Sequence, residues 1–208
     1  MEKHKYDSII FDLDGTLWDA VECVVTIWND ALEKAGIEPT LNYEQLSRCM
    51  GLRIEQIFDR VIPQATQQQR ELIKENCAKT EQKYLAEKGG VLYDNVEDTL
   101  AALRKTHRLF IVSNCGIGYI NAFFKAHGLD KYFEDFECAG RTGLPKGDNI
   151  RLLAERHNLR APVYIGDTVS DFEAANAAKV PFIHAAYGFG EVECDVKALS
   201  FSQIPSLV

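Results

Sequence analysis

Hydrophobic and polar residues form two different patterns in successive parts of the chain. A short apolar run over residues 6–11 predicts a buried strand that ends at Asp12. From Asp19 onward, apolar residues recur at helical spacing, and residues 43–88 contain no convincing strand. The pattern predicts helices with bounds at 19–36, where Asp19 is a candidate N-cap, and at 43–49, 53–62 and 66–88.

After the glycine pair at 89–90, strands and helices alternate. The expected helices are 95–107, 117–126, 147–158 and 169–178, and the expected strands are 109–113, 133–139, 163–166 and 180–185. Such alternation implies βαβ units with right-handed crossovers and a parallel sheet. We therefore predict an α/β fold with a Rossmann-like core of residues 1–17 and 89–208, into which a small all-helical cap of residues 18–88 is inserted after strand one.

Charge and composition narrow the possible partners. The 208 residues carry 23 basic and 31 acidic side chains, a net charge of −8, and no run of basic residues. Nucleic acid and anionic membrane surfaces are therefore not expected as partners. No apolar stretch approaches the roughly 20 residues that span a bilayer. The polar start of the chain, residues 1–8, lacks the apolar segment of a signal peptide, so a cytoplasmic location is expected.

The first predicted strand ends in two acidic residues, Asp12 and Asp14. Residues i and i+2 of an extended chain point to the same side, so both carboxylates could face one site, where they repel unless a cation or proton lies between them. The Asp-Gly pair that follows also favours a hairpin, but the pattern from Trp18 onward is helical and supplies no second strand. A calcium loop fits no better, because Leu17 and Cys23 occupy the positions that need Gly and Glu.

A second acidic pair follows the strand predicted over residues 163–166. Asp167 and Asp171 are four residues apart and would share one face of the first turn of the next helix. Alone, the pair could simply cap that helix. Together with Asp12 and Asp14, it puts four carboxylates at the ends of parallel strands, and such a cluster indicates a hard cation, Mg²⁺ where phosphate is also bound.

Two further positions could bind phosphate. Ser113 and Asn114 end the strand predicted over 109–113, where a hydroxyl, an amide and backbone N–H groups can hold phosphate oxygens, although a plain helix cap is the alternative. Lys146 opens the helix that follows residues 143–145. A lysine there is usually solvated, but beside a carboxylate cluster it could pair with a nucleophile and with a bound phosphate.

In order and placement, these residues resemble the four motifs of the haloacid dehalogenase-like superfamily of phosphatases. The matching motifs are Asp12-Leu13-Asp14-Gly15-Thr16-Leu17, Ser113-Asn114, Lys146 and Gly166-Asp167 with Asp171. The helical insertion resembles the small cap of the phosphoglycolate phosphatase and beta-phosphoglucomutase branch, and residues 185–190 are similar to the phosphoglycolate phosphatase branch.

The resemblance implies an Mg²⁺-dependent phosphatase that acts through an aspartyl-phosphate. Asp12 would be the nucleophile, and Asp14 would protonate the leaving group and then activate water. Asp12, Asp14 (through its carbonyl) and Asp167 would hold Mg²⁺, with Asp171 orienting these ligands. The phosphoryl oxygens would be bound by Thr16, Ser113, Asn114 and Lys146.

Several alternatives stay open at this stage. A phosphosugar mutase of the beta-phosphoglucomutase type shares this core, and a receiver-like phospho-acceptor module also uses an acidic cluster, Mg²⁺, a hydroxyl residue and a lysine. The expected partner is one small phosphorylated metabolite, such as phosphoglycolate, a sugar phosphate or a nucleotide, with the protein a monomer or a weak homodimer. Arg53 could contact the distal end of this substrate or belong to a solvated helix surface, and Trp18 could line the site or simply pack.

Overall fold

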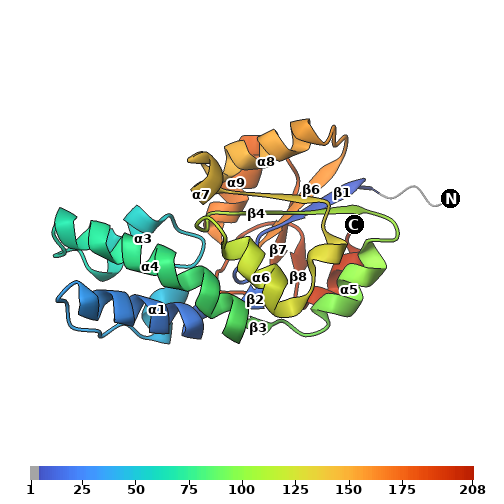
Figure 1. Ribbon diagram of the computed structural model, residues 1–208. Helices are drawn as coiled ribbons and strands as arrows, with labels where there is room; N and C mark the ends of the chain where they lie inside the picture. Colours follow the sequence, from blue (N-terminus) through green and yellow to red (C-terminus); the bar gives the residue numbers. More distant parts are fainter. Residues whose placement is uncertain (1–4) are drawn as a thin grey trace.

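A computed structural model describes residues 5–208 and contains a six-stranded sheet, helices against the sheet and a second group of helices to one side (Figure 1). The strands lie in the order β5-β4-β1-β6-β7-β8, and each neighbouring pair is parallel. Parallel strands align their carboxyl ends at one edge, so the segments that follow β1, β4 and β6 meet there. The bounds are β1 Ser8–Phe11, β4 Arg108–Ser113, β5 Asp135–Cys138, β6 Pro162–Gly166, β7 Phe182–Ala185 and β8 Lys197–Ala198.

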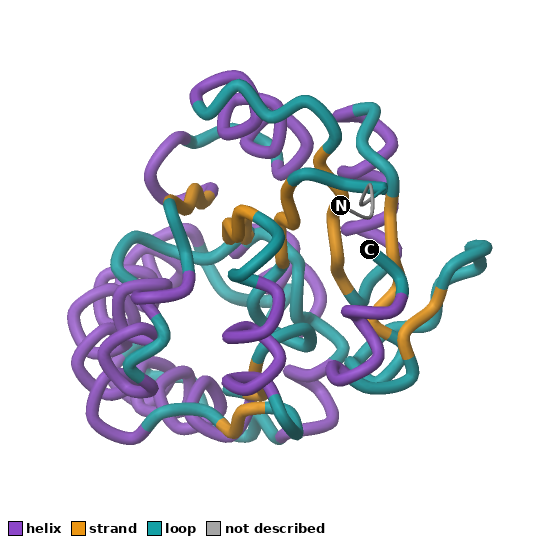
Figure 2. Tube along the Cα trace, turned by 90° about the vertical axis from the view of Figure 1, so that its right-hand side faces the viewer, coloured by secondary structure: helices purple, strands orange, loops and turns teal. Residues whose placement is uncertain are grey.

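Both faces of the sheet are covered, as Figure 2 shows from the side. Side chains alternate along a strand, so neighbouring residues of β1 enter different layers. Ile10 packs with Phe110 and with Ile150, whereas Phe11 faces the other layer, where its ring lies 5.7 Å from that of Phe201. The elements of these layers are α5 Val96–Leu103, α6 Tyr119–His127, α7 Ala139–Thr142, α8 Lys146–Arg156, α9 Val169–Ala178 and the 3-10 helices η1 Asp130–Tyr132 and η2 Phe201–Ser206.

The second group of helices, here called the cap helices, follows β1 in the chain. It comprises α1 Val21–Lys34, α2 Tyr43–Ser47, α3 Ile54–Val61 and α4 Gln67–Lys88. Helix α4 packs along α1 and also contacts α6 of the sheet layers, so it connects the two parts of the molecule (Figure 1). This arrangement agrees with the α/β class and the helical insertion that the sequence predicts.

The connection into the cap helices differs from the sequence prediction. Helix α1 begins after Ala20, not at an N-cap formed by Asp19, and Trp18–Asp19 forms a short strand, β2, antiparallel to β3 Val91–Leu92. The expectation that the chain is helical from Trp18 onward is therefore wrong. Gly90 permits the pairing, because a Cβ at that position would lie 2.6 Å from the backbone oxygen of Asp19.

The other differences concern short elements and element ends. Strands β5 and β7 begin two residues later than predicted, at Asp135 and Phe182, and helix α5 ends at Leu103 instead of residue 107. Helix α7, strand β8 and the two 3-10 helices are too short to show a hydrophobic period, and the sequence pattern did not predict them. Helix α9 has the predicted bounds.

Within residues 5–208, no helix combines the length and hydropathy needed to cross a bilayer. The expectation of no signal peptide was based on residues 1–8, of which residues 1–4 lie outside the described part of the chain.

Candidate active site

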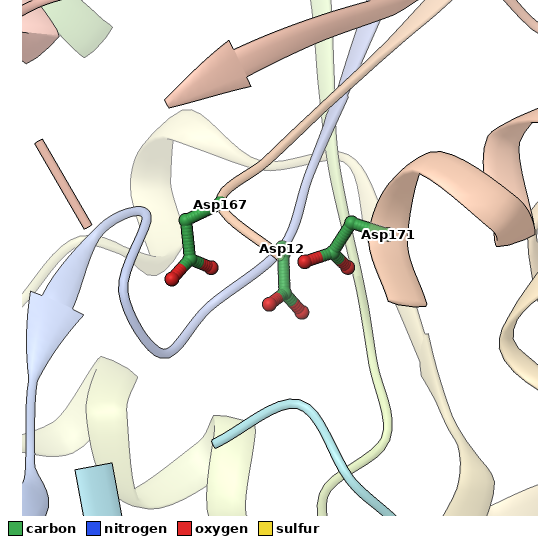
Figure 3. Close-up of side chains that lie close together, drawn as sticks. All are labelled: Asp12, Asp167 and Asp171. Carbon is green, nitrogen blue, oxygen red and sulfur yellow. The ribbon is translucent and has the colours of Figure 1, made fainter. Parts of the chain in front are cut away.

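Three aspartates meet at the carboxyl edge of the sheet. Asp12 follows β1, Asp167 follows β6, and Asp171 lies in the first turn of α9 (Figure 3). Each offers a carboxylate oxygen, and these three oxygens lie within 4.8 Å of one another. All three residues are buried, which concentrates negative charge where water cannot screen it.

Lys146, the first residue of α8, enters this cluster. Its Nζ donates hydrogen bonds to Asp12 Oδ1 at 2.9 Å and to Asp171 Oδ1 at 2.6 Å, and the residue is only 3% exposed. Burial alone would lower the pKa of Lys146, but the charges of Asp12 and Asp171 raise it above its ordinary value. The lysine therefore stays charged and holds one oxygen of Asp12 in a fixed place.

Asp171 differs from the other two aspartates in having both oxygens engaged. Oδ1 accepts from Lys146 and from the Tyr164 hydroxyl at 3.2 Å, and Oδ2 accepts from the Thr168 hydroxyl at 2.6 Å and the Thr168 backbone N at 3.0 Å. Burial would raise the pKa of Asp171, but the charge of Lys146 and these hydrogen bonds lower it. Asp171 is therefore ionised and forms an ion pair with Lys146.

The cluster also contains oxygens that lack a partner. Asp12 Oδ2 and Asp167 Oδ1 are buried and accept no hydrogen bond within residues 5–208. Burial and the charge of Asp171 raise the pKa of Asp12 to about 7, and burial with the same charge raises the pKa of Asp167 well above its usual range. Unpartnered carboxylate oxygens in such a place fit a hard cation, which would offset the desolvation of both groups.

The remaining oxygen of Asp167 is held by backbone. Phe189 N donates to Asp167 Oδ2 at 2.8 Å. Gly15, whose φ is +79°, and Gly188 both lie against this carboxylate, and a Cβ at either position would collide with Asp167. The segment 185–190, which the sequence analysis noted only for a resemblance, therefore fixes the orientation of Asp167.

Asp14 occupies a separate position beside the cluster. Its Oδ1 accepts a hydrogen bond from Trp18 Nε1 at 3.0 Å and another from the Tyr119 hydroxyl at 2.9 Å. Burial raises the pKa of Asp14 to about 6, although these two hydrogen bonds pull it down. Asp14 can therefore exchange a proton near neutral pH, as a general acid and base must.

Tyr119 was missed by the sequence analysis, and Trp18 was left open between lining the site and packing. The only signal for Tyr119 is its place at the start of α6, directly after Gly118, which has a φ of +86°. Trp18 is fully buried and is not among the residues that line the cavity. It packs edge-on against Tyr119 at 5.7 Å and acts on the site only through the hydrogen bond from its Nε1 to Asp14.

The candidate phosphate-binding residues lie around the same edge of the sheet. Thr16 Oγ1 is buried without a partner among the described residues, and the backbone oxygen of Thr16 accepts from the Tyr187 hydroxyl at 2.9 Å. Ser113 Oγ accepts weakly from the Cys115 backbone N at 3.4 Å. The side-chain oxygens of Thr16 and Ser113 thus lack a strong partner among the described residues.

Asn114 makes a contact that the sequence did not predict. Its Nδ2 donates to the backbone oxygen of Gly51 at 2.8 Å, in the loop that precedes α3, while its Oδ1 is buried without a partner in the described part of the chain. Gly51 has a φ of +77° and lies close to Thr168, to which a Cβ would come within 3.2 Å. The cap helices are therefore tied to the sheet edge through this loop.

A cavity of about 460 Å³ lies between the sheet edge and the cap helices. The sheet layers line it with Asp12, Asp14, Ser113, Asn114, Tyr119 and residues 115–117 and 139–140, and the cap side contributes Val24, Trp28, residues 49–55, Ile57, Lys74, Cys77, Ala78 and Glu81. A cavity of this size holds a small metabolite, with polar groups at one end and a mostly apolar wall at the other.

Comparison with known protein families assigns the chain to one of them. The family model described as "Haloacid dehalogenase-like hydrolase" matches residues 9–185, which is most of the chain and includes every aspartate of the site. The chain belongs to this family. The resemblance predicted from the four motifs is thereby confirmed.

The chain is also similar to curated proteins over most of its length. A phosphoglycolate phosphatase from Aliivibrio fischeri is 30% identical over 199 residues, which cover 89% of this chain and 86% of that protein. A phosphoglycolate phosphatase from Escherichia coli is 28% identical, and the match covers 88% of this chain and 82% of that protein. Family and relatives together make this chain an enzyme, a phosphoric monoester hydrolase, as the motifs predicted.

Solved structures of the family share the fold. A haloacid dehalogenase-like family hydrolase from Streptococcus pneumoniae superposes with a TM-score of 0.85 at 20% identity, over 98% of each chain. One from Bacteroides fragilis gives 0.84 at 24% identity, covering 96% of this chain and 99% of that one. The predicted fold class, a parallel-sheet core with an inserted helical cap, is confirmed.

Proposed function

We propose that this hydrolase is an Mg²⁺-dependent phosphatase that cleaves a small phosphate monoester through an aspartyl-phosphate on Asp12. The observation that carries the proposal is the state of Asp12: buried, held through Oδ1 by Lys146, with Oδ2 unpartnered at the cavity. A fixed carboxylate with a charged lysine beside it is an oriented nucleophile. The phosphoryl group that Asp12 attacks and the alcohol that leaves would both lie in the cavity.

In the first step, an oxygen of Asp12 attacks phosphorus as the ester P–O bond breaks. Asp14 donates its proton to the leaving oxygen, and its pKa of about 6 supports this role. In the second step, the ionised Asp14 takes a proton from water, the water oxygen attacks the phosphoryl group, and inorganic phosphate leaves Asp12. The two aspartates return to their starting states.

Asp12 and Asp167 would hold Mg²⁺ together with the backbone carbonyl of Asp14, and their unpartnered oxygens support this assignment. Mg²⁺, when bound, supplies positive charge against the phosphoryl oxygens. Asp171 would act by positioning Lys146, whose Nζ donates to it at 2.6 Å. Thr16, Ser113 and Asn114 would donate to the phosphoryl oxygens beside the lysine.

The same geometry supports a division of the chain into two parts. We propose that residues 18–88 form the cap and that residues 1–17 and 89–208 form the core, with the β2–β3 pairing at the junction. The cap covers the cavity, which supports one small phosphorylated metabolite as substrate, with no nucleic acid or membrane as partner. The proposed state is a monomer or weak homodimer in the cytoplasm.

The names of the relatives make phosphoglycolate the first substrate to test, followed by sugar phosphates and nucleotides. The deciding experiment measures inorganic phosphate released from p-nitrophenyl phosphate with Mg²⁺ and again with a chelator. We expect steady release over many turnovers that chelation abolishes. Activity that survives chelation would refute the proposal, and isomerisation of a sugar phosphate without phosphate release would favour a mutase.

A further inference from the structure

We propose that Glu81 of α4 selects the leaving group of the substrate. The preferred esters are those whose alcohol carries a hydrogen-bond donor, and an ammonium group is the best donor. Esters whose alcohol carries a carboxylate instead are disfavoured. This inference rests on the proposed phosphatase function and names the substrate class of the same site.

The position of Glu81 puts it at the leaving-group end of the cavity. Glu81 lines the cavity together with Asp14 and Tyr119, which form the proton-transfer side of the site. Helix α4 packs on α6, and Glu81 Oε2 lies 3.6 Å from the point where a Cβ of Gly116 would stand. Gly116 belongs to the loop that leads into Tyr119, so the carboxylate approaches the side of the site from which Asp14 would protonate the leaving oxygen.

Glu81 is also an acid that lacks a partner among the described residues. It forms no hydrogen bond and no ion pair with any residue in the range 5–208, although it is half-buried. Burial, followed by the charge of Asp14, raises the pKa of Glu81 to about 7. A carboxylate in such a place is stabilised by a donor or a cation that enters the cavity and is destabilised by a second anion.

The positive groups that line the cap side, Lys74 and Arg53, bond to groups other than Glu81. Lys74 Nζ lies 3.4 Å from a carboxylate oxygen of Glu55 and 3.4 Å from one of Glu71. Arg53, which precedes α3, donates from its guanidinium to the backbone oxygen of Gly143 at 3.3 Å. On the α4 wall of the cavity, a substrate carboxylate would therefore meet the unpartnered Glu81, whereas Lys74 is already paired with two other acids.

Three two-carbon esters isolate the effect of charge. Phosphoglycolate, 2-hydroxyethyl phosphate and 2-aminoethyl phosphate have the same length and end in a carboxylate, a hydroxyl and an ammonium group. For the wild-type enzyme with Mg²⁺, we expect kcat/KM to rise in that order, by about tenfold or more from the carboxylate to the ammonium ester. A wild-type preference for phosphoglycolate would overturn the inference, with no variant needed.

The variant Glu81→Gln removes the charge and keeps the shape. We expect the ratio of kcat/KM for the ammonium ester to that for phosphoglycolate to fall by about tenfold, mostly because phosphoglycolate improves. Glu75→Gln is the matched control: Glu75 lies on the same helix, is exposed and pairs with Lys79 at 3.6 Å, so the ratio should stay at the wild-type value. An unchanged ratio in Glu81→Gln would refute the role of Glu81.

Rates on p-nitrophenyl phosphate separate this inference from the function it rests on. Asp12-dependent hydrolysis of the aryl ester, combined with no selectivity among the three alkyl esters, would leave the phosphatase standing and overturn only the role of Glu81. No phosphate release from any of the four esters in the presence of Mg²⁺ would overturn both.

Discussion

The two sides of the cavity are built in opposite ways. On the sheet side, charged groups hold one another: Lys146 bonds Asp12 and Asp171, and Asp14 accepts from Trp18 and Tyr119. On the cap side, the wall is largely apolar, and Glu81 has no internal partner in the described chain.

This contrast separates two tasks. A network in which each side chain is fixed by another is pre-organised for one reaction, because little rearrangement is needed when charge develops. A wall with few fixed polar groups contributes little to that chemistry but decides which alcohol can occupy the cavity. Changes on the sheet side should therefore reduce turnover of all esters alike, and changes on the cap side should alter their ranking.

Asp12→Asn gives the largest expected effect. The amide is a poor nucleophile, so turnover of any phosphate ester should fall by roughly a thousandfold or more. The fold should remain, because Lys146 keeps its bond to Asp171. Steady-state phosphate release and thermal unfolding measure the two effects, with the exposed Asp30→Asn as control. A variant that retains more than about a tenth of the wild-type rate would exclude Asp12 as nucleophile.

Lys146→Met tests how far the sheet side depends on its central cation. Removing the lysine leaves Asp12 and Asp171 buried and uncompensated, which should cost about 3–5 kcal/mol of unfolding free energy at pH 7. Lys146 lowers the folded-state pKa of Asp171, so in the variant this pKa rises above the unfolded value. The stability deficit should then shrink as the pH falls and the carboxyl becomes protonated.

Urea unfolding at pH 7 and pH 5, without added metal, measures this change. The double variant Lys146→Met with Asp171→Asn should recover part of the lost stability, because one of the two unpaired charges is gone. Equal stability of wild type and Lys146→Met at pH 7 would contradict the network described here.

The sequence could predict the sheet side far better than the cap side. The strands and helices that carry this side have a clear hydrophobic pattern: Asp12, Asp14 and Asp167 follow strands, Ser113 ends one, and Lys146 opens a helix. Parallel strands bring such positions to one edge of the sheet. Their side-chain assignments as nucleophile, ligand or phosphate binder remain predictions.

The contacts that the sequence could not predict depend on helix packing. Tyr119 reaches Asp14 across 105 positions of the chain, and Asn114 reaches Gly51 across 63. Glu81 lies near Gly116 only because α4 crosses α6. The hydrophobic pattern of one helix does not indicate which residues of another helix will pack against it. These contacts could therefore be identified only from the structure.

Asp167→Asn should weaken the metal site while leaving the rest of the network in place. Losing one anionic ligand should raise the Mg²⁺ concentration for half-maximal activity by about tenfold or more. Gly188→Ala should act in the same direction, because a Cβ there would push on Asp167. Mg²⁺ titrations followed by phosphate release and by calorimetry measure both. An unchanged Mg²⁺ requirement in Asp167→Asn would remove this residue from the proposed metal site.

Tyr119→Phe should give the smallest effect, a shift in pH dependence. The Tyr119 hydroxyl lowers the pKa of Asp14 against the larger opposing effect of burial, so its removal should move that pKa above its present value of about 6. Asp14 must be protonated to expel an alkyl alcohol, so the alkaline limb of the pH–rate profile for such an ester should move upward by less than one pH unit. Tyr43→Phe, which removes a hydroxyl from the carboxylate of Asp19 instead, should leave the limb in place. A downward shift in Tyr119→Phe would mean that the hydroxyl does not stabilise the ionised form of Asp14 and that another group controls this limb.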